Sequence, residues 1–527
     1  MAWMVSSLEY IKALCEVIAR ILYNFIRLKK LMALALLSPL LLGCEPFYDP
    51  VENKDVPTSP GSVWNNNSIV VKKTVENPFD VTDLSGTMSL SRLLDIALYN
   101  NPATRASWNA ARASAYAYRA SLSNYYPTIE YTGSLDAQTS SGSPFAVSSQ
   151  SITTSNTAAT TTSRMTNIFN DLSLTYLLLD FGGRSATAEY ALQTLYASNW
   201  QHNFTMQQVM LSVLTAYTGY LGNRGLVISY ETDLKDAEVA LNAAQLMHRA
   251  GLTTMSDVLL AQSNLEQTRT NLIQARGAEK TSLGEILIAL GLPPDADISI
   301  EQLPQALPVI KISGDISCLL EIAKQRRPDL GVAIAAIKQQ EAQLAISYSS
   351  SMPTLTGFLG WDQIRLISPK KPSGNTKVAS LELNFPIFQG FFYMNQQRQL
   401  RGQVEEAMAN LDVQVSTVST QVVTAYYSFT SAEAALPSSA AAVEYSKRAY
   451  RGYIVQYKTG TASLLDVLSA LTALSNARAQ QVLTRTQWAA SLANLSFSVG
   501  VLEDTSGIWE KSPPKDLYKL PIQDKDA

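Results

Sequence analysis

The chain has 527 residues, of which 46% are hydrophobic and 16% charged, and its formal net charge is −3. Without a basic excess, no nucleic-acid-binding surface is expected. Two His and three Cys are too few for the usual metal-ligand spacings, so we expect no metal or other cofactor. His202 and His248 fall in long helical segments with no nucleophile motif nearby, so we expect no enzyme.

The first segment, 1–43, is typical of a secretory signal. A basic cluster at 27–30 precedes an apolar run that ends in Leu41-Leu42-Gly43-Cys44. This ending resembles a bacterial lipobox, which predicts cleavage before Cys44 and lipid on its thiol. Glu45 follows, which favours delivery to the outer membrane. The alternative is an ordinary membrane anchor, although the apolar run is shorter than the roughly 20 residues of a spanning helix.

Segment 44–88 is rich in Pro, Asn and Ser, which predicts an extended arm. Two similar stretches then begin at Leu93 (LLDIALYNNPAT) and at Leu319 (LLEIAKQRRPDL), 226 positions apart. Each predicts a short helix, a Pro at the start of a second helix, an Ala-rich helix and an extended segment.

A second pair of similar stretches lies further along the chain. Gly251 and Gly460 are 209 positions apart, and each precedes an Asp-Val-Leu sequence and a helical run. The sequence therefore predicts a duplication. Its parts are a first repeat at 89–300, a linker at 301–314, a second repeat at 315–503 and a tail at 504–527.

Alternation of apolar and polar residues predicts four strands, two in each repeat. The strands are expected near 128–137, near 172–178, from Thr354, and near 380–387. On the last one, Leu381, Leu383, Phe385 and Ile387 should face lipid, and Glu382 and Asn384 should face water. Strands of about ten residues with two unlike faces suit an outer membrane. The alternative is the edge of a soluble sandwich.

Four strands cannot close a barrel with a lumen, and an open edge in lipid leaves backbone groups without partners. We therefore expect a homotrimer with a shared twelve-stranded barrel. Long helices are predicted at 184–248 and 391–456, with heptad-like apolar steps and many small residues. Gly222 and Gly225 in the first, and Pro437 in the second, predict an interruption at mid-length. The expected fold class is an α+β membrane protein with a coiled-coil barrel.

The junction sequences LLLDFGGR and FPIFQGFF, the Pro-Thr helices and the two Gly-to-Asp-Val-Leu turns make residues 89–503 similar to the TolC family of outer-membrane efflux proteins. The lipobox makes the chain more similar to the acylated members that serve drug-efflux pumps. The resemblance implies a trimer in the outer membrane of a Gram-negative bacterium. It also implies a periplasmic helical tunnel that works with an adaptor and an inner-membrane transporter. Alternatives are a passive porin, a structural lipoprotein, or the exit duct of type I protein secretion.

The resemblance also assigns roles to the two turns. The expected adaptor-docking residues are Gly251, Leu252, Thr253, Gly460, Thr461 and Ala462. The alternative is that these small residues form tight turns and nothing more.

A resting aperture is expected at Leu464, Leu465 and Asp466, with Tyr457 and Asp257 as a lock between the hairpins. Ser469 stands where the family often has a second aperture Asp, and Ala462 where the family has an Arg partner of the lock. A weaker lock and a ring of lower charge are therefore expected. The alternative is that Asp257 and Asp466 simply cap their helices.

Overall fold

The computed structural model describes residues 56–57, 59–64, 86–142, 161–294, 296, 298–301, 315–368 and 374–502. All of them belong to one compact unit, Asn53–Ala527. The expected signal, Cys44, most of the arm, most of the linker and the whole tail lie outside the described residues.

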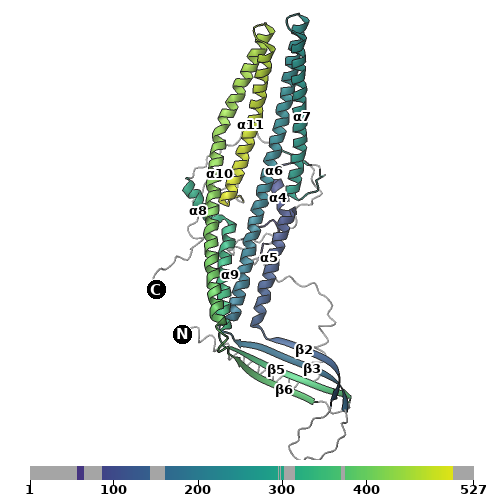
Figure 1. Ribbon diagram of the computed structural model, residues 1–527, viewed down its shortest axis with the longest axis vertical. Coiled ribbons are helices and arrows are strands. Elements are labelled where there is room, and N and C mark those ends of the chain that lie inside the picture. Colours follow the sequence, from purple (N-terminus) through teal and green to yellow (C-terminus); the bar gives the residue numbers. More distant parts are fainter. Residues whose placement is uncertain are drawn as a thin grey trace, which may run out of the picture. The chain divides into compact units, whose positions relative to one another are not determined.

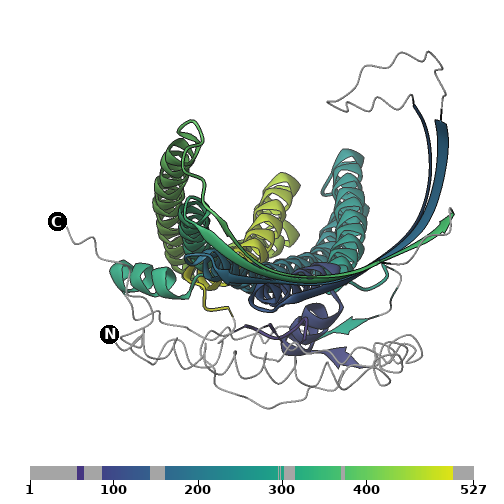
Figure 2. The same cartoon turned by 90° about the horizontal axis from the view of Figure 1, so that it is seen from below.

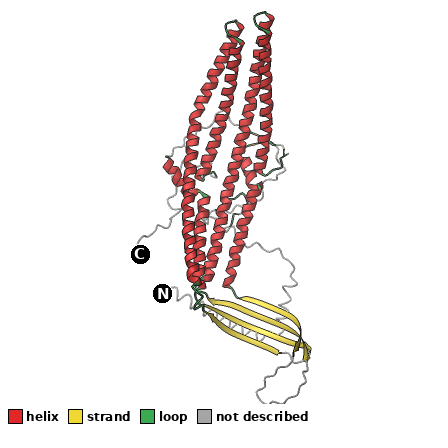
Figure 3. Cartoon of the chain, in the orientation of Figure 1, coloured by secondary structure: helices red, strands yellow, loops and turns green. Residues whose placement is uncertain are grey.

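The four long strands lie apart from the long helices in this unit (Figure 3). The helices, labelled in Figure 1, are α4 (Leu90–Asn100), α5 (Pro102–Ser121), η1 (Leu122–Tyr125), α6 (Gly183–Arg249), α7 (Met255–Leu290), α8 (Ile316–Arg326), α9 (Pro328–Ser350), α10 (Phe392–Lys458) and α11 (Leu464–Val499). Pro is the first residue of both α5 and α9, where its missing N–H costs nothing.

The four predicted strands form one antiparallel sheet in the order β2-β3-β5-β6. Their bounds are β2 (Thr128–Gly142), β3 (Thr161–Leu179), β5 (Thr354–Ser368) and β6 (Gly374–Asn384). The sheet bends into an arc (Figure 2). The last strand ends earlier than predicted, because Pro386 has no N–H to donate to a ladder; Phe385 and Ile387 therefore lie beyond it. A short parallel pair joins β1 (Thr87–Met88) to β4 (Ser299–Ile300).

The strand register gives the sheet two unlike faces. Leu172 lies opposite both Tyr131 and Trp361, which places these three residues on one face. By the same register, Leu381 and Leu383 of β6 lie on this face as well, and they are 72% and 68% exposed. The other face is more polar, with the row Thr132, Asp171, Asp362 and Thr376 running across all four strands.

Two long hairpins extend away from the sheet and return about half of the way: α6 with α7, and α10 with α11 (Figure 1). Helices α6 and α10 each have 67 residues, or about 100 Å. The predicted interruption is wrong, because both helices run through their Gly or Pro residues. The glycines instead permit close packing: a Cβ on Gly225 would lie 2.9 Å from Val482 of α11, and one on Gly222 would lie 2.7 Å from Thr486. In α10, Pro437 removes one hydrogen bond from a helix that continues on both sides.

Each half has its own apolar core where its helices meet, one around Val213 and Ile286 and the other around Val422 and Leu495. A third core is shared by both hairpins near their tips and draws residues from α6, α7, α10 and α11. This shared core positions the two turns relative to each other.

Candidate functional site: the hairpin tips

The two turns have the same backbone. Gly251 and Gly460 have φ of +72° and +79°, a left-handed conformation that favours glycine. In both turns, the residue after the glycine donates its amide to a carbonyl five residues back. Leu252 N lies 2.9 Å from Met247 O, and Thr461 N lies 2.9 Å from Gln456 O. These bonds satisfy the last carbonyls of α6 and α10 and fix the tip geometry.

The helices that leave the tips begin with capping boxes. At α7, Thr254 and Asp257 exchange backbone-to-side-chain bonds of 3.2 and 3.3 Å. At α11, Ser463 and Asp466 do the same at 2.9 and 3.2 Å. A hydrogen bond from the Thr253 hydroxyl is the main cause that lowers the pKa of Asp257, and one from the Ser463 hydroxyl lowers that of Asp466. Both carboxylates are therefore ionised at neutral pH and cap their helices.

Tyr457 of the second hairpin lies close to Thr253 and Asp257 of the first. Its side chain is 4% exposed within the shared core. Among the described residues, no group accepts a hydrogen bond from its hydroxyl. The structure thus brings the expected lock residues together without the expected hydrogen bond. The bonds that the Asp257 side chain accepts come from Thr253 and Thr254 of its own hairpin. Burial is the main cause that raises the pKa of Tyr457, so the phenol keeps its proton.

The three expected aperture residues differ in exposure. Leu464 is 4% exposed and belongs to the shared core, whereas Leu465 is 65% exposed. Asp466 is also exposed. Within one chain, Leu464 therefore packs between the hairpins, and of the three expected aperture residues only Leu465 and Asp466 are exposed.

The first tip carries an apolar surface that the sequence analysis missed. Leu252, Met255 and Leu259 are 69%, 54% and 59% exposed. They follow the helical spacing of three and four residues, which was the signal available in the sequence. Of the other expected docking residues, Gly251, Gly460 and Thr461 are exposed, and Thr253 and Ala462 are partly exposed.

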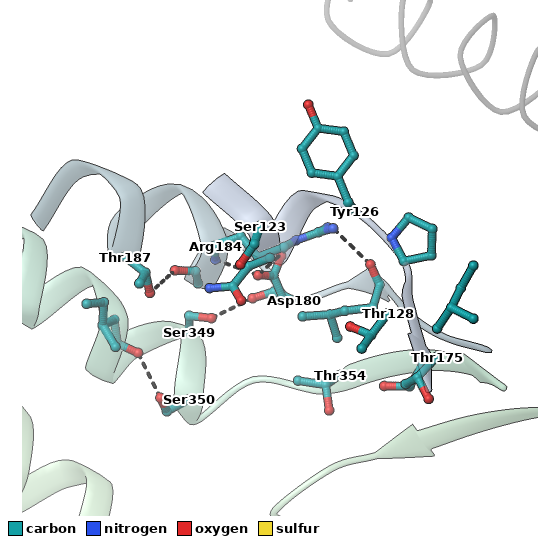
Figure 4. Close-up of a pocket in the computed structure, with 17 residues that line it drawn as sticks. Ser123, Tyr126, Thr128, Thr175, Asp180, Arg184, Thr187, Ser349, Ser350 and Thr354 are labelled. Atoms are coloured by element: carbon teal, nitrogen blue, oxygen red, sulfur yellow. Dashed lines mark hydrogen bonds and ion pairs between the residues drawn. The ribbon is translucent and has the colours of Figure 1, made fainter. Parts of the chain in front are cut away.

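A cavity of about 910 Å³ lies where the helices meet the sheet (Figure 4). Its wall is rich in hydroxyl groups, including those of Thr128, Thr175 and Thr356. Asp180 holds this joint together. Its carboxylate accepts from the Arg184 amide at 2.6 Å, and its carbonyl accepts from the Ser349 hydroxyl, which links β3, α6 and α9. Asp180 also pairs with the Arg184 guanidinium, so these two charges stabilise the joint between the helices and the sheet.

Across the part of the chain that the structure describes, no three His, Cys, Asp or Glu side chains are placed to hold a metal ion. Within the same residues, no helix combines the length and the apolar character needed to span a membrane. His202, which is fully buried, bonds to Ser107 and to the carbonyl of Ser62, and so holds arm residues against α6. His248 bonds to the carbonyl of Thr253.

An amphipathic four-stranded antiparallel sheet, continued by two long helical hairpins, defines the class of outer-membrane channels with a helical extension. The chain belongs to the outer membrane efflux protein family, whose model matches residues 93–292 and 319–501. The TolC-like fold and the duplication predicted from the sequence are confirmed.

Curated relatives span most of the chain. Protein CyaE of Bordetella pertussis is 26% identical over 434 residues, which cover 81% of this chain and 87% of CyaE. The probable efflux pump outer membrane protein TtgC of Pseudomonas putida is 22% identical over 425 residues, covering 78% of this chain and 83% of TtgC. Among solved structures, the outer-membrane channel OprN has a TM-score of 0.67 at 18% identity and covers 78% of this chain and 89% of its own. CusC has a TM-score of 0.65 at 17% identity, with 84% and 98% covered.

The family assignment gives the function at a coarse level. The protein is an outer-membrane efflux channel of a tripartite export system in a Gram-negative bacterium, with its helices in the periplasm, and it is not an enzyme. Members of the family form trimers and pair with an adaptor and an inner-membrane transporter.

Proposed function

We propose that three copies of this chain form a twelve-stranded exit duct for small molecules, with the hairpin tips as its resting gate and its docking site. The observation that carries the proposal is the sheet itself. Among the described residues, its edge strands, β2 and β6, have no partner on their outer sides, and its apolar face is exposed. In lipid, each unpaired backbone group costs several kcal/mol, so closure by two further copies satisfies both edges.

The gate follows from the exposed residues of the second tip. Three chains would bring three copies of Asp466 into one ring, with Leu465 beside it as an apolar constriction. Carboxylates that converge at a pore favour cations. Ser469 in place of a second Asp, and a Tyr457 hydroxyl without an acceptor, support a gate that is held weakly.

For docking, the apolar surface of Leu252, Met255 and Leu259 suits the helical hairpin of an adaptor, since helices bind one another through apolar residues at this spacing. Leu252→Glu should abolish export while leaving heat-labile trimers on a gel. Val239→Glu is the matched control, because Val239 is 46% exposed on the same hairpin but away from its tip. Equal export by the two variants would argue against docking here.

Small molecules are proposed as the cargo because the names of several relatives refer to the export of small molecules. They include a toluene efflux pump outer membrane protein, an antibiotic efflux pump outer membrane protein and a pyoverdine export outer membrane protein. Crosslinking in cells followed by identification of the co-purified inner-membrane partner tests this choice. A transporter for drugs or other small molecules supports it, and a protein-secretion transporter replaces it with type I secretion.

Lipid on Cys44 is proposed to add a second attachment to the outer membrane. The support is the Leu41-Leu42-Gly43-Cys44 sequence behind an apolar run. Each acyl chain would contribute about 0.8 kcal/mol per buried CH₂, while the barrel anchors the trimer in any case. Cys44→Ala should therefore impair sorting more than assembly. Intact-mass analysis that finds an unmodified Cys44 in the mature protein would contradict the proposal.

A further inference from the structure

The contact between α6 of the first hairpin and α11 of the second changes character along its length. Toward the tips, the shared core consists largely of alanines and leucines. Its alanines are Ala237, Ala240, Ala243, Ala244, Ala261 and Ala470. On α6, four of the five residues in this core are alanines, and the apolar contact is non-directional. Tilting one hairpin against the other therefore moves fewer interlocking side chains here than it would further toward the sheet.

A buried ion cluster ends this apolar part. Arg478 of α11 pairs with Asp233 and, at 2.9 Å, with Asp236, both on α6. Ser475 donates to Asp233 at 2.6 Å, and Tyr450 of α10 donates to the backbone carbonyl of Asp236 at 2.9 Å. The Asp233 side chain is 2% exposed and that of Arg478 is 15% exposed. Separating the helices here would leave buried charges without partners, which is costly.

Beyond the ion cluster, toward the sheet, the two helices interlock. The positions that a Cβ would take on Gly225 and Gly222 are already occupied by Val482 and Thr486. The side chains of α11 therefore fit into notches in α6. A helix seated in this way cannot shift along its neighbour without first moving out of the notches.

From this sequence of contacts, we propose that the Arg478–Asp233–Asp236 cluster is the pivot of the gate. The part of the second hairpin between the cluster and the tip moves, and the part between the cluster and the sheet stays fixed. Asp233 lies 18 residues before Gly251 and Arg478 lies 18 residues after Gly460, so the moving part is about 27 Å long on each hairpin. This inference rests on the proposed gate at the tips and adds where its motion begins.

The duplication supplies a matched control. The position of Arg478 in the second repeat corresponds to Arg269 in the first, 209 residues earlier. Arg269 pairs only with Glu266 on its own helix among the described residues, and its side chain is 49% exposed. The position of Asp233 corresponds to Ala442 in the second repeat. The cluster is therefore confined to the α6–α11 contact.

The first test is single-channel recording of purified trimers in planar bilayers. The double variant Asp233→Asn with Arg478→Gln removes the charges of the most buried pair but keeps side chains that can hydrogen-bond. Asp236 loses its cationic partner, but its side chain is 25% exposed and so keeps contact with water. We expect several-fold more frequent opening than in the wild type, and Arg269→Gln should behave like the wild type. Wild-type opening by the double variant, with trimers intact on a gel, would overturn the pivot.

A second test fixes the interlocked part directly. A Cβ on Gly225 would lie 3.8 Å from that of Val482, a separation that suits a disulfide. Gly225→Cys with Val482→Cys, in a Cys318→Ser background, should keep wild-type opening and export when oxidised. Loss of opening on oxidation, with recovery on reduction, would show that the helices move sheetward of the cluster and would contradict the pivot. If wild-type trimers conduct no current at all, the proposed duct fails instead.

Discussion

In the first repeat, Asn101 at the start of α5 donates from its side chain to the carbonyl of Ala289, 2.9 Å away. At the corresponding position of the second repeat, Arg327 donates to the carbonyl of Ser498 at 3.2 Å. Arg327 also holds Asp329 through two bonds of 3.0 and 2.6 Å. The same joint is thus made by a neutral amide in one half and by a buried ion pair in the other. The backbone geometry repeats while the chemistry that fills it does not.

The strand-to-helix junctions teach the same lesson. Phe181 and Gly182 have φ of 50° and 92°, and their counterparts Gly390 and Phe391 have 58° and 62°. Both junctions use two left-handed residues in a row, yet phenylalanine and glycine have exchanged places. A non-glycine residue is strained in this conformation. The same left-handed turn therefore forms in both halves although the order of its two residues is reversed. Each half contains one phenylalanine in a strained conformation.

The largest expected difference between the halves is at their joints. Arg327→Ala would leave the carboxylate of Asp329, which is 11% exposed, without its cationic partner, while the hydrogen bonds from Gln414 and the Leu330 amide remain. The loss should be about 3 kcal/mol of unfolding free energy, the low end for a broken buried ion pair. Asn101→Ala removes a neutral capping side chain and should cost about 1 kcal/mol. Urea unfolding of detergent-solubilised trimers measures both. Equal losses of unfolding free energy would mean that the charged joint stabilises the fold no more than the neutral one.

In the sheet, by contrast, equivalent substitutions in the two halves should have the same effect. Leu172 and Leu381 are equivalent positions on the apolar face, so Arg at either should cost about 2–4 kcal/mol in the barrel if the position lies near mid-bilayer. Trimer yield should fall sharply in both variants. Ser380→Arg is the control, because Ser380 lies on the polar face next to Leu381. A yield as low as that of Leu381→Arg would break the assignment of the faces.

The capping boxes sharpen the comparison of the two tips. Ser463→Ala removes the cap of α11 and should cost about 1 kcal/mol. Thr254→Ala should cost less, because the Thr253 hydroxyl still bonds to Asp257. The lowered pKa values of both Asp residues mean that the caps are complete above about pH 4 and are lost as the pH falls through the folded-state values. Amide hydrogen exchange at the start of α7 and α11 would report both effects.

The smallest expected effect concerns the arm, which docks on a His in the first half where the second half has Leu411. Burial lowers the pKa of His202 from 6.5. Folding therefore favours the neutral ring, and its contribution to docking is complete above about pH 6.5 and weakens as the pH falls below it.

Limited proteolysis near 56–64 should accordingly be faster at about pH 5.5 than at pH 7.5. His202→Leu should remove this pH dependence. If the variant retained the full pH dependence, His202 would not be the titrating group.

Periodicity and repetition in the sequence predict a large part of the fold. Four strands, two long hairpins and two Gly turns all follow from local patterns that the structure keeps. The prediction for Gly222 and Gly225 was wrong, because a glycine that breaks a helix and one that admits a neighbouring helix look alike in the sequence. For the same reason, Leu464 and Leu465 were grouped together at the tip. Only the fold of the two hairpins on each other decides which of two adjacent leucines is buried.

The pairing of Arg478 with Asp233 was also beyond the sequence. These residues are 245 positions apart, and neither lies in a recognisable motif. In contrast, the capping residues Asp257 and Asp466 were predictable, because a cap depends on residues within one turn of helix.

The central claim, that exposed carboxylates of the second tip line the resting aperture, is tested most directly by ion selectivity. Reversal potentials of single trimers in a KCl gradient would be measured for Asp466→Asn and Asp257→Asn, both of which keep an oxygen that can cap the helix. The account predicts that Asp466→Asn loses cation preference while Asp257→Asn retains it. Unchanged selectivity in Asp466→Asn, or equal loss in both variants, would place the aperture elsewhere.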